Sequence, residues 1–270
     1  MSSLLPFPHE HLLQQGASAA PVLGIDTGGP IATLGVVAAG RICGTLVRSA
    51  GSHCANLPEA VEQLLDVSGV GWADLAAIAV AIGPGSFTGL RVGLSYAKAV
   101  ATVRNIAMMG ISSLDGLALC VGKEIPESCT ICPIIDARRG EVYAGLYGLV
   151  TDALQRISDV LVVPPADLVA RLEDEVVFVG DSMAERVRSL AAANGVRASV
   201  VGEAGLHLRG TFVAAIGAAR VVSKEADVIA TLEPLYVRPP DVAASAAAVN
   251  PGEDIHGTPR GRTHPAANRS

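Results

Sequence analysis

Aromatic residues are scarce in this chain of 270 residues: Phe, Trp and Tyr make up 3% of it, whereas 50% of the residues are hydrophobic. Alanine, valine, leucine and isoleucine must therefore fill the core. No uncharged apolar run of 18 or more residues occurs, which argues against a membrane span. The length suits one compact protein of one or two domains.

Cysteine and basic charge are also limited. The five cysteines are scattered, which is typical of reduced thiols in a cytoplasmic protein. Cys129 and Cys132 have redox or zinc spacing, but they have no second pair and lie in an apolar run, so two buried thiols are favoured. The net charge of −6 argues against a primary nucleic-acid binder. Residues 1–20 do not resemble a signal peptide and are expected to form a flexible extension.

The hydrophobic pattern predicts a meander of strands followed by alternating strands and helices. Strands are expected at 22–27, 32–38, 41–47, 75–83, 106–111, 130–137, 141–148, 176–181 and 197–202, and helices at 57–68, 86–103, 112–122, 164–173, 183–193 and 211–225. This order favours an α/β fold with mixed sheets flanked by helices in two lobes, 21–110 and 111–240. Residues 241–270 lack periodicity and are expected to be a disordered tail.

Small residues recur at every fourth position of the helix expected at 86–103. Gly85, Gly89, Gly93, Ala97 and Ala101 therefore form one row. Two glycines inside a helix destabilise it by about 2 kcal/mol, and the close approach of another backbone would offset that loss. The spacing leaves open whether this backbone belongs to the chain's own sheet or to another subunit.

The turn before this helix has the sequence Gly83-Pro84-Gly85-Ser86. It joins a buried strand to a helix N-terminus, where free amides and the helix dipole favour an anion. Ser86 and Thr88 can cap the first turn or contact a phosphate. A simple capped turn is the alternative, and the glycine spacing matches neither the P-loop nor the Rossmann fingerprint.

Four segments together resemble the TsaB (YeaZ) family. They are GPGSFTGLRVG at 83–93, LGIDT at 23–27, DARRGEVY at 136–143 and PLYVR at 234–238. Their order and spacing follow the family over about residues 21 to 240. The resemblance implies a two-lobed fold of the actin/hexokinase/Hsp70 (ASKHA) type.

The resemblance also implies a noncatalytic subunit. It would pair with the catalytic subunit TsaD and activate it during synthesis of threonylcarbamoyladenosine at adenosine 37 of tRNAs that read codons beginning with A. A TsaE-type ATPase would join the pair, tRNA would be contacted only through the complex, and the isolated chain would form a homodimer without enzymatic activity. We expect no cofactor on the chain alone, with ATP or ADP at the interface of the complex.

No metal-ligand pattern is present. The catalytic relative holds its metal through a His-x-x-x-His pair, whereas His53 stands alone in the corresponding region here. The resemblance and the small-residue row place the partner interface on the helices 57–68 and 86–103. The interface residues expected are Leu57, Val61, Leu64, Ser86, Phe87, Gly89, Leu90, Gly93, Leu94 and Ala97.

A second set of residues is expected to form a polar site that is either structural or nucleotide-binding. It consists of Asp26, Thr27, Gly83, Gly85, Thr88, Arg91, Asp136, Arg138 and Glu141. Asp26 occupies the place of a Mg²⁺–ATP ligand in true kinases of this fold, but Gly28 and Gly29 replace the hydroxyls usual after it. For the last three residues of the set, a salt-bridged hairpin is the alternative and the commoner arrangement. Two rival functions stay open: a small-molecule kinase of the same fold, and a homodimeric scaffold.

Overall fold

The computed structural model describes residues 4–6, 19–49, 56–121, 128–150, 153–173, 175–201 and 203–237. The chain divides into two units, and the described residues all belong to the unit that ends at Arg238. The expected tail at 241–270 lies outside the described residues, as does most of the expected extension. Within that extension, Leu4–Pro6 form a short strand, β1.

The first sheet contains the expected meander. Its strands are β2 (Val22–Asp26), β3 (Ile31–Ala38), β4 (Arg41–Ser49), β5 (Ala77–Gly83) and β6 (Ala107–Ser112), in the order β4-β3-β2-β5-β6. The first three are antiparallel neighbours, whereas β5 and β6 run parallel to β2 and β5 respectively. Helices must connect the parallel strands, and α3 (Phe87–Arg104) joins β5 to β6.

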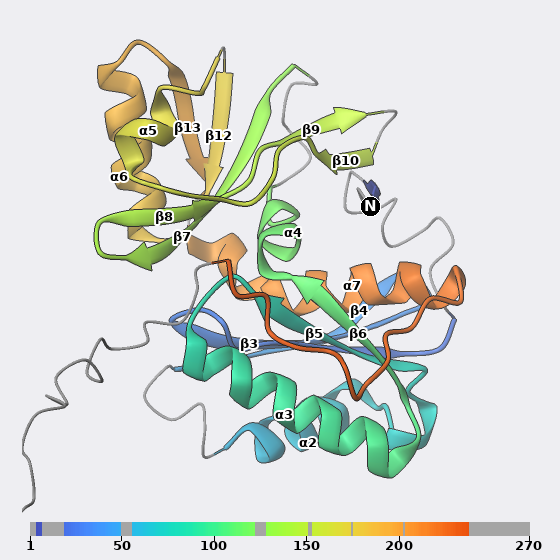
Figure 1. Ribbon diagram of the computed structural model, residues 1–270. Helices are drawn as coiled ribbons and strands as arrows, with labels where there is room; N and C mark the ends of the chain where they lie inside the picture. The colour runs from blue at the N-terminus through green and yellow to red at the C-terminus, as the bar shows by residue number, and fades with distance from the viewer. Residues whose placement is uncertain are drawn as a thin grey trace, which may run out of the picture. The chain divides into compact units, whose positions relative to one another are not determined.

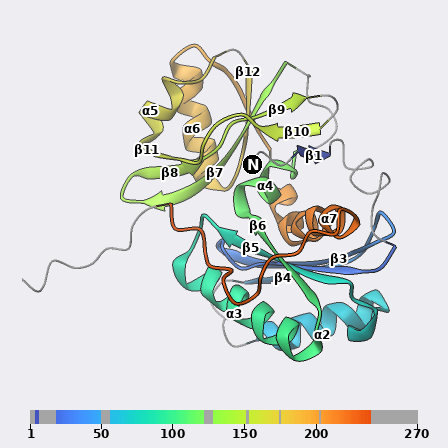
Figure 2. The same cartoon turned by 45° about the vertical axis from the view of Figure 1, so that its right-hand side comes forward.

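Helices cover both faces of this sheet. Helices α2 (Leu57–Ser68) and α3 lie on one face and α7 (Arg209–Val222) on the other (Figures 1 and 2). Side chains alternate accordingly: Leu23 packs in the cluster with α2 and α3, and Val22 packs in the cluster with α7. Coverage of both faces explains the continuous apolar sequence of β5.

The second sheet follows α4 (Ser113–Ala118). Its strands run in the order β1-β10-β9-β7-β12-β13, with β8 between β7 and β11. They are β7 (Thr130–Arg138), β8 (Glu141–Ala144), β9 (Tyr147–Val150), β10 (Ala153–Arg156), β11 (Leu161–Val163), β12 (Glu175–Val179) and β13 (Arg197–Val201). The single strand expected at 141–148 is wrong: it divides into β8 and β9, because β7 pairs with each at a different part of its length. Helices α5 (Pro165–Val169) and α6 (Ser182–Ala193) accompany this sheet, and Leu168 and Val187 pack in one cluster with Phe178 of β12.

The chain returns to the first sheet after the short 3₁₀ helix Glu203–Leu208. Helix α7 packs on β2, β3 and β5, although its residues fall in the range 111–240 that we assigned to the second lobe. Helix α7 lies close to β2 because the facing residues are small: a Cβ on Gly24 would overlap the carbonyl oxygen of Gly210. In the described ranges, no helix is both long and apolar enough to cross a bilayer.

Candidate functional site

The turn at residues 83–86 is a capped connection between β5 and α3. Ser86 is the N-cap residue, and its hydroxyl accepts a hydrogen bond from the amide of Gly89 at 3.3 Å. The amide of Ser86 donates to the carbonyl of Gly28 at 2.8 Å. A Cβ on Gly85 would lie 2.6 Å from the same carbonyl oxygen, so the turn packs against the loop after β2. Thr88 is exposed.

The row of small residues faces the chain's own β2 loop. The Thr27 hydroxyl donates to the carbonyl of Gly89 at 2.7 Å. A Cβ on Gly89 would overlap the Thr27 carbonyl oxygen, and one on Gly93 would overlap the Thr27 hydroxyl oxygen. Of the two neighbours left open by the spacing, the chain's own first lobe is therefore the one that fills the row.

Most of the expected interface side chains are also inside the chain. Leu57, Val61, Leu64, Leu90, Leu94 and Ala97 are buried, and Gly89 and Gly93 are covered by Thr27. The apolar stripe of the two helices α2 and α3 faces the first sheet, and the assignment of the helices to a partner interface stays a prediction. Ser86 and Phe87 are exposed, with Phe87 47% accessible.

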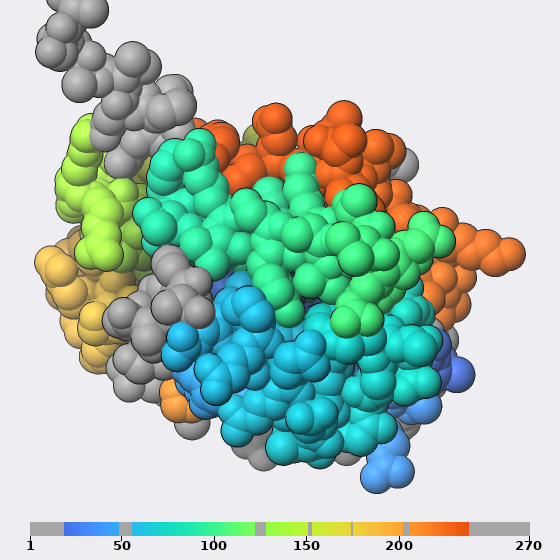
Figure 3. Space-filling view, turned by 90° about the horizontal axis from the view of Figure 1, so that it is seen from below, coloured from blue at the N-terminus to red at the C-terminus, as the bar shows by residue number. Residues whose placement is uncertain are grey.

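The opposite sides of the same two helices form a surface (Figure 3). We call this surface the α2–α3 face; its exposed residues include Pro58, Glu59, Glu62, Gln63, Asp66 and Val67 on α2, and Phe87, Arg91, Ser95, Ala99, Thr102 and Val103 on α3. Trp72 bridges the two helices. Its indole N–H donates to the Glu62 carboxylate of α2 at 2.9 Å, and the Arg104 guanidinium of α3 lies 4.4 Å from the centre of its ring.

Asp26 is held in a buried ion pair that the sequence pattern did not predict. Its Oδ2 lies 3.5 Å from Nε of Arg209, and both side chains are buried. Its Oδ1 accepts a hydrogen bond from the amide of Gly28 at 2.8 Å. The guanidinium also donates to the carbonyl of Ile31 at 2.9 Å.

The loop after β2 closes around this guanidinium. A Cβ on Gly29 would overlap the terminal nitrogens of Arg209, so the missing side chain at Gly29 is what admits the arginine. The positive charge beside Asp26 is thus supplied by the chain, and the side chains do not fit a Mg²⁺–phosphate group at that carboxylate. No cluster of three or more His, Cys, Asp or Glu suited to a metal occurs in the described part of the chain.

The acidic and basic residues of the β7–β8 turn interact with one another within the turn. The Asp136 carboxylate accepts from the Arg138 amide at 2.7 Å and pairs with the Arg138 guanidinium at 3.2 Å. The Arg138 side chain is largely exposed, and Glu141 lies opposite Arg138 in the strand register. This geometry matches the salt-bridged hairpin among the alternatives.

Arg91 joins two sequence motifs that are far apart in the chain. Its Nε donates to the hydroxyl of Tyr236 at 3.0 Å, and its guanidinium lies 3.9 Å from the centre of the Phe87 ring. The rings of Phe87 and Tyr236 are 5.6 Å apart. Tyr236, from the PLYVR segment, thus meets the segment at 83–93 on the surface.

Two further expectations concern histidine and cysteine. His53 lies outside the described residues. Cys129 and Cys132 are both free thiols, and burial raises the pKa of each. A raised pKa disfavours the reactive thiolate, as expected for buried thiols.

Comparison with known proteins shows which family the chain belongs to. The family model described as "TsaD: tRNA N6-adenosine threonylcarbamoyltransferase" matches residues 48–259. The chain belongs to the TsaD family, in its TsaB (YeaZ) group. It is 37% identical over 132 residues to the tRNA threonylcarbamoyladenosine biosynthesis protein TsaB of Bacillus subtilis, covering 48% of this chain and 56% of that protein. It is 35% identical over 95 residues to the protein of the same name from Escherichia coli, covering 35% of this chain and 41% of that protein. The chain thus spans about half the length of the curated relatives it matches.

A solved TsaB-group structure has the same fold. YeaZ from Pseudomonas aeruginosa superposes with a TM-score of 0.67 at 21% identity, covering 81% of this chain and 100% of that one. The fold is therefore the ASKHA type expected from the sequence. At that identity the likeness concerns the fold alone.

Proposed function

We propose that this TsaB-group chain is a noncatalytic subunit in the biosynthesis of threonylcarbamoyladenosine in tRNA, and that it pairs with a TsaD-type catalytic subunit and activates it. The observation that carries the proposal is the buried Asp26–Arg209 pair in a chain that matches the TsaD family model. A catalytic relative needs its polar cleft for metal and substrate. Here an arginine of the chain fills the place beside the aspartate.

Pairing would use the α2–α3 face. Its backbone is firmly placed, because the inner sides of both helices are buried against the first sheet. Its outer side includes exposed apolar residues, with Val67 68% and Val103 85% accessible. A partner of the same fold carries equivalent helices, so the two chains would pack helix to helix around a pseudo-twofold axis.

The remaining partners follow from the same proposal. A TsaE-type ATPase would join the complex, tRNA would be held by the complex as a whole, and ATP or ADP would bind at the junction of subunits. The isolated chain would self-associate through the α2–α3 face, and the catalytic partner would displace the second copy.

The kinase alternative requires Mg²⁺–ATP at Asp26, and the Arg209 contact argues against it. The homodimeric scaffold remains the alternative to be separated by experiment. The observation that favours it is the same exposed apolar surface on α3, because Val103 and Phe87 would serve a second copy equally well.

Sedimentation velocity of the chain mixed with the TsaD-type protein of the same organism tests the proposal. We expect a one-to-one complex that Val103→Glu weakens. Ile157→Glu is the matched control, since Ile157 is also exposed (57%) but follows β10 in the second sheet. Sedimentation of self-dimers alone, with and without ATP, would support the scaffold instead.

A further inference from the structure

The segment after α7 runs back along the edge of the first sheet. We call residues 225–236 the strap; Figure 1 shows it passing β6 beside α3. The amide of Asp227 donates to the carbonyl of Met108 at 2.9 Å, and the amide of Leu235 donates to the carbonyl of Ile82 at 2.7 Å. Between these points Ile229 and Leu232 pack on the cluster of α2 and α3. The strap therefore pairs with the edge strand β6 at Met108 and reaches the end of β5 at Ile82, so part of the exposed edge of β6 is covered.

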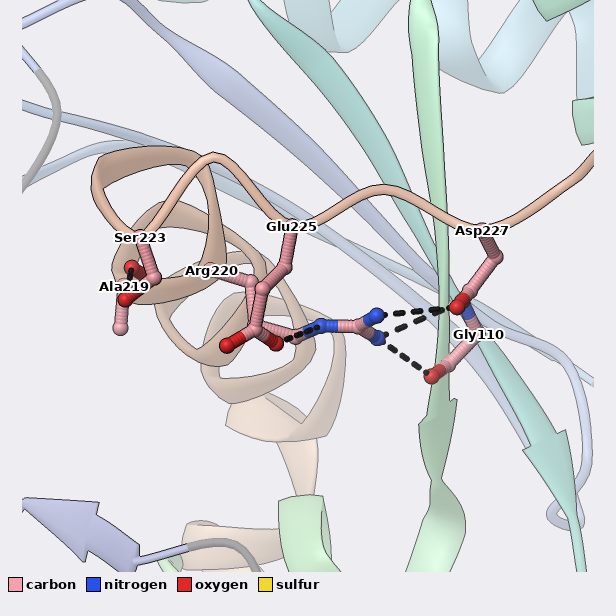
Figure 4. Close-up of polar contacts among 6 residues, drawn as sticks. All are labelled: Gly110, Ala219, Arg220, Ser223, Glu225 and Asp227. Carbon is pink, nitrogen blue, oxygen red and sulfur yellow. Dashed lines mark hydrogen bonds and ion pairs between the residues drawn. The ribbon is translucent and has the colours of Figure 1, made fainter.

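A charged clasp holds the start of the strap (Figure 4). The Arg220 guanidinium donates to both carboxylate oxygens of Asp227, at 2.9 and 3.3 Å, and to the carbonyl of Gly110 at 3.2 Å. Its Nε pairs with Glu225 at 3.3 Å. The amide of Gly110 donates to Asp227 at 2.7 Å. Burial alone would raise the pKa of Asp227, but these hydrogen bonds lower it, which keeps the carboxylate charged and the clasp closed.

The other end of the strap organises the first turn of α3. The Tyr236 hydroxyl fixes Nε of Arg91, and the Tyr236 ring lies beside Phe87. Arg91 is thereby held flat over Phe87 instead of extending freely into solvent. A side chain already fixed in its bound geometry loses less conformational entropy when a partner binds.

This cluster exposes aromatic surface and guanidinium donors that have no hydrogen-bond acceptor in the described part of the chain. Phe87 is 47% and Tyr236 39% accessible. Within the described residues, no carboxylate pairs with Arg91, and its terminal nitrogens have no hydrogen-bond acceptor. A planar guanidinium with both terminal nitrogens free matches the two oxygens of a carboxylate. Aromatic and arginine side chains together are also the composition of binding hot spots.

We propose that Phe87, Arg91 and Tyr236 form a preassembled anchor on the α2–α3 face, which receives a carboxylate and an adjoining apolar side chain of the TsaD-type subunit. Tyr236 is a positioning residue, and the strap is the device that carries it to α3. The proposal rests on the proposed function, because it names what the partner must offer. The net charge of −6 favours a protein carboxylate over an RNA phosphate as the occupant.

Binding by isothermal titration to the TsaD-type subunit, at low and high salt, tests the anchor in the full chain. Arg91→Ala should weaken binding about tenfold and flatten its salt dependence, because a charged contact is lost. Tyr236→Phe keeps the ring but removes the acceptor, and should weaken binding about threefold. Arg186→Ala and Tyr143→Phe are matched controls away from α3 and should bind as the wild type does.

Hydrogen exchange of the unbound chain distinguishes loss of the positioning role of Tyr236 from destabilisation of the whole fold. Tyr236→Phe should speed exchange of amides in residues 87–92 while leaving β7 and β12 unchanged. If the wild type binds and both variants bind equally well, the anchor is overturned and the proposed function stands. If the wild type does not bind, the proposed function fails and the anchor fails with it. If Arg91→Ala instead weakens binding of tRNA to the chain alone and leaves subunit binding unchanged, the occupant is RNA and the anchor is overturned.

Discussion

The hydroxyl of Thr27 donates a hydrogen bond to the carbonyl of Gly89, 2.7 Å away, across the row of small residues on α3. This contact explains why the helix contains two glycines. The loop after β2 needs the space that side chains would occupy, and the close approach fixes α3 on the first sheet. Under the proposed function, a partner would therefore contact the outer side of the helix.

Substitution of the row should destabilise the isolated chain. We expect Gly93→Ala to lower the free energy of unfolding by about 1–3 kcal/mol, because the new methyl group overlaps the Thr27 hydroxyl. Gly148→Ala is the matched control, since its Cβ would meet neighbours no nearer than 3.7 Å. Urea unfolding measures both. Equal stability of Gly93→Ala and wild type would show that the row does not face Thr27.

Removal of the buried guanidinium of Arg209 should also destabilise the chain. Arg209→Met leaves the buried carboxylate of Asp26 without its ion pair, which typically destabilises a protein by about 3–5 kcal/mol. Adding Asp26→Asn should restore part of the loss, since no buried charge then remains. A double-mutant cycle by urea unfolding measures the coupling, and additive losses would contradict a direct pair.

The same pair predicts the response to nucleotide. A ligand at 100 times its Kd would add about 2.7 kcal/mol of stability. We expect Mg²⁺–ATP to leave the thermal unfolding temperature of the isolated chain unchanged, because Arg209 occupies the place beside Asp26. A rise in that temperature which Asp26→Asn abolishes would restore the kinase alternative.

A buried hydrogen bond between α4 and β9 should give a pH-dependent stability. The Tyr147 hydroxyl donates to Asp115 at 2.7 Å, and burial raises the pKa of Asp115 although Tyr147 lowers it in part. Because the folded pKa exceeds the unfolded one, stability falls as the pH rises from the unfolded pKa through the folded pKa. Tyr147→Phe removes the donor to the charged form, so it should lower stability by about 1–3 kcal/mol at neutral pH.

The loss in Tyr147→Phe should shrink at about pH 4.5, where more of the Asp115 carboxyl is protonated. Tyr143→Phe is the control, because that residue is only partly buried. Urea unfolding at both pH values measures the difference. A loss of equal size at both would show that Asp115 is not the group responsible.

Local patterns predicted the elements that are amphipathic or fully buried. Helix α2 has the expected bounds, 57–68, because its apolar stripe faces the sheet and Gly69 ends it in a left-handed conformation. Strands β10 and β11 were not predicted, since three or four residues carry too little alternation. The helix expected at 112–122 is assigned only over Ser113–Ala118.

The contacts of the candidate site depend on partners that are distant in the sequence. The period of the small residues predicted a close neighbour but could not say that it is Thr27. Arg209 lies 183 positions after Asp26 and two positions before the helix expected at 211–225, so no local pattern connected it with a carboxylate. Tyr236 was noted as part of a motif, but no local signal connected it with Arg91, 145 positions earlier.

Reconstituted tRNA modification tests the central claim most directly. The TsaD-type and TsaE-type proteins of the same organism would be supplied with threonylcarbamoyl-adenylate, ATP and tRNA, with or without this chain, and the nucleosides of the hydrolysed tRNA would be quantified by mass spectrometry. We predict that threonylcarbamoyladenosine forms only when this chain is present together with the catalytic subunit, and that the chain alone forms none. Equal formation without the chain would contradict its role as an activating subunit.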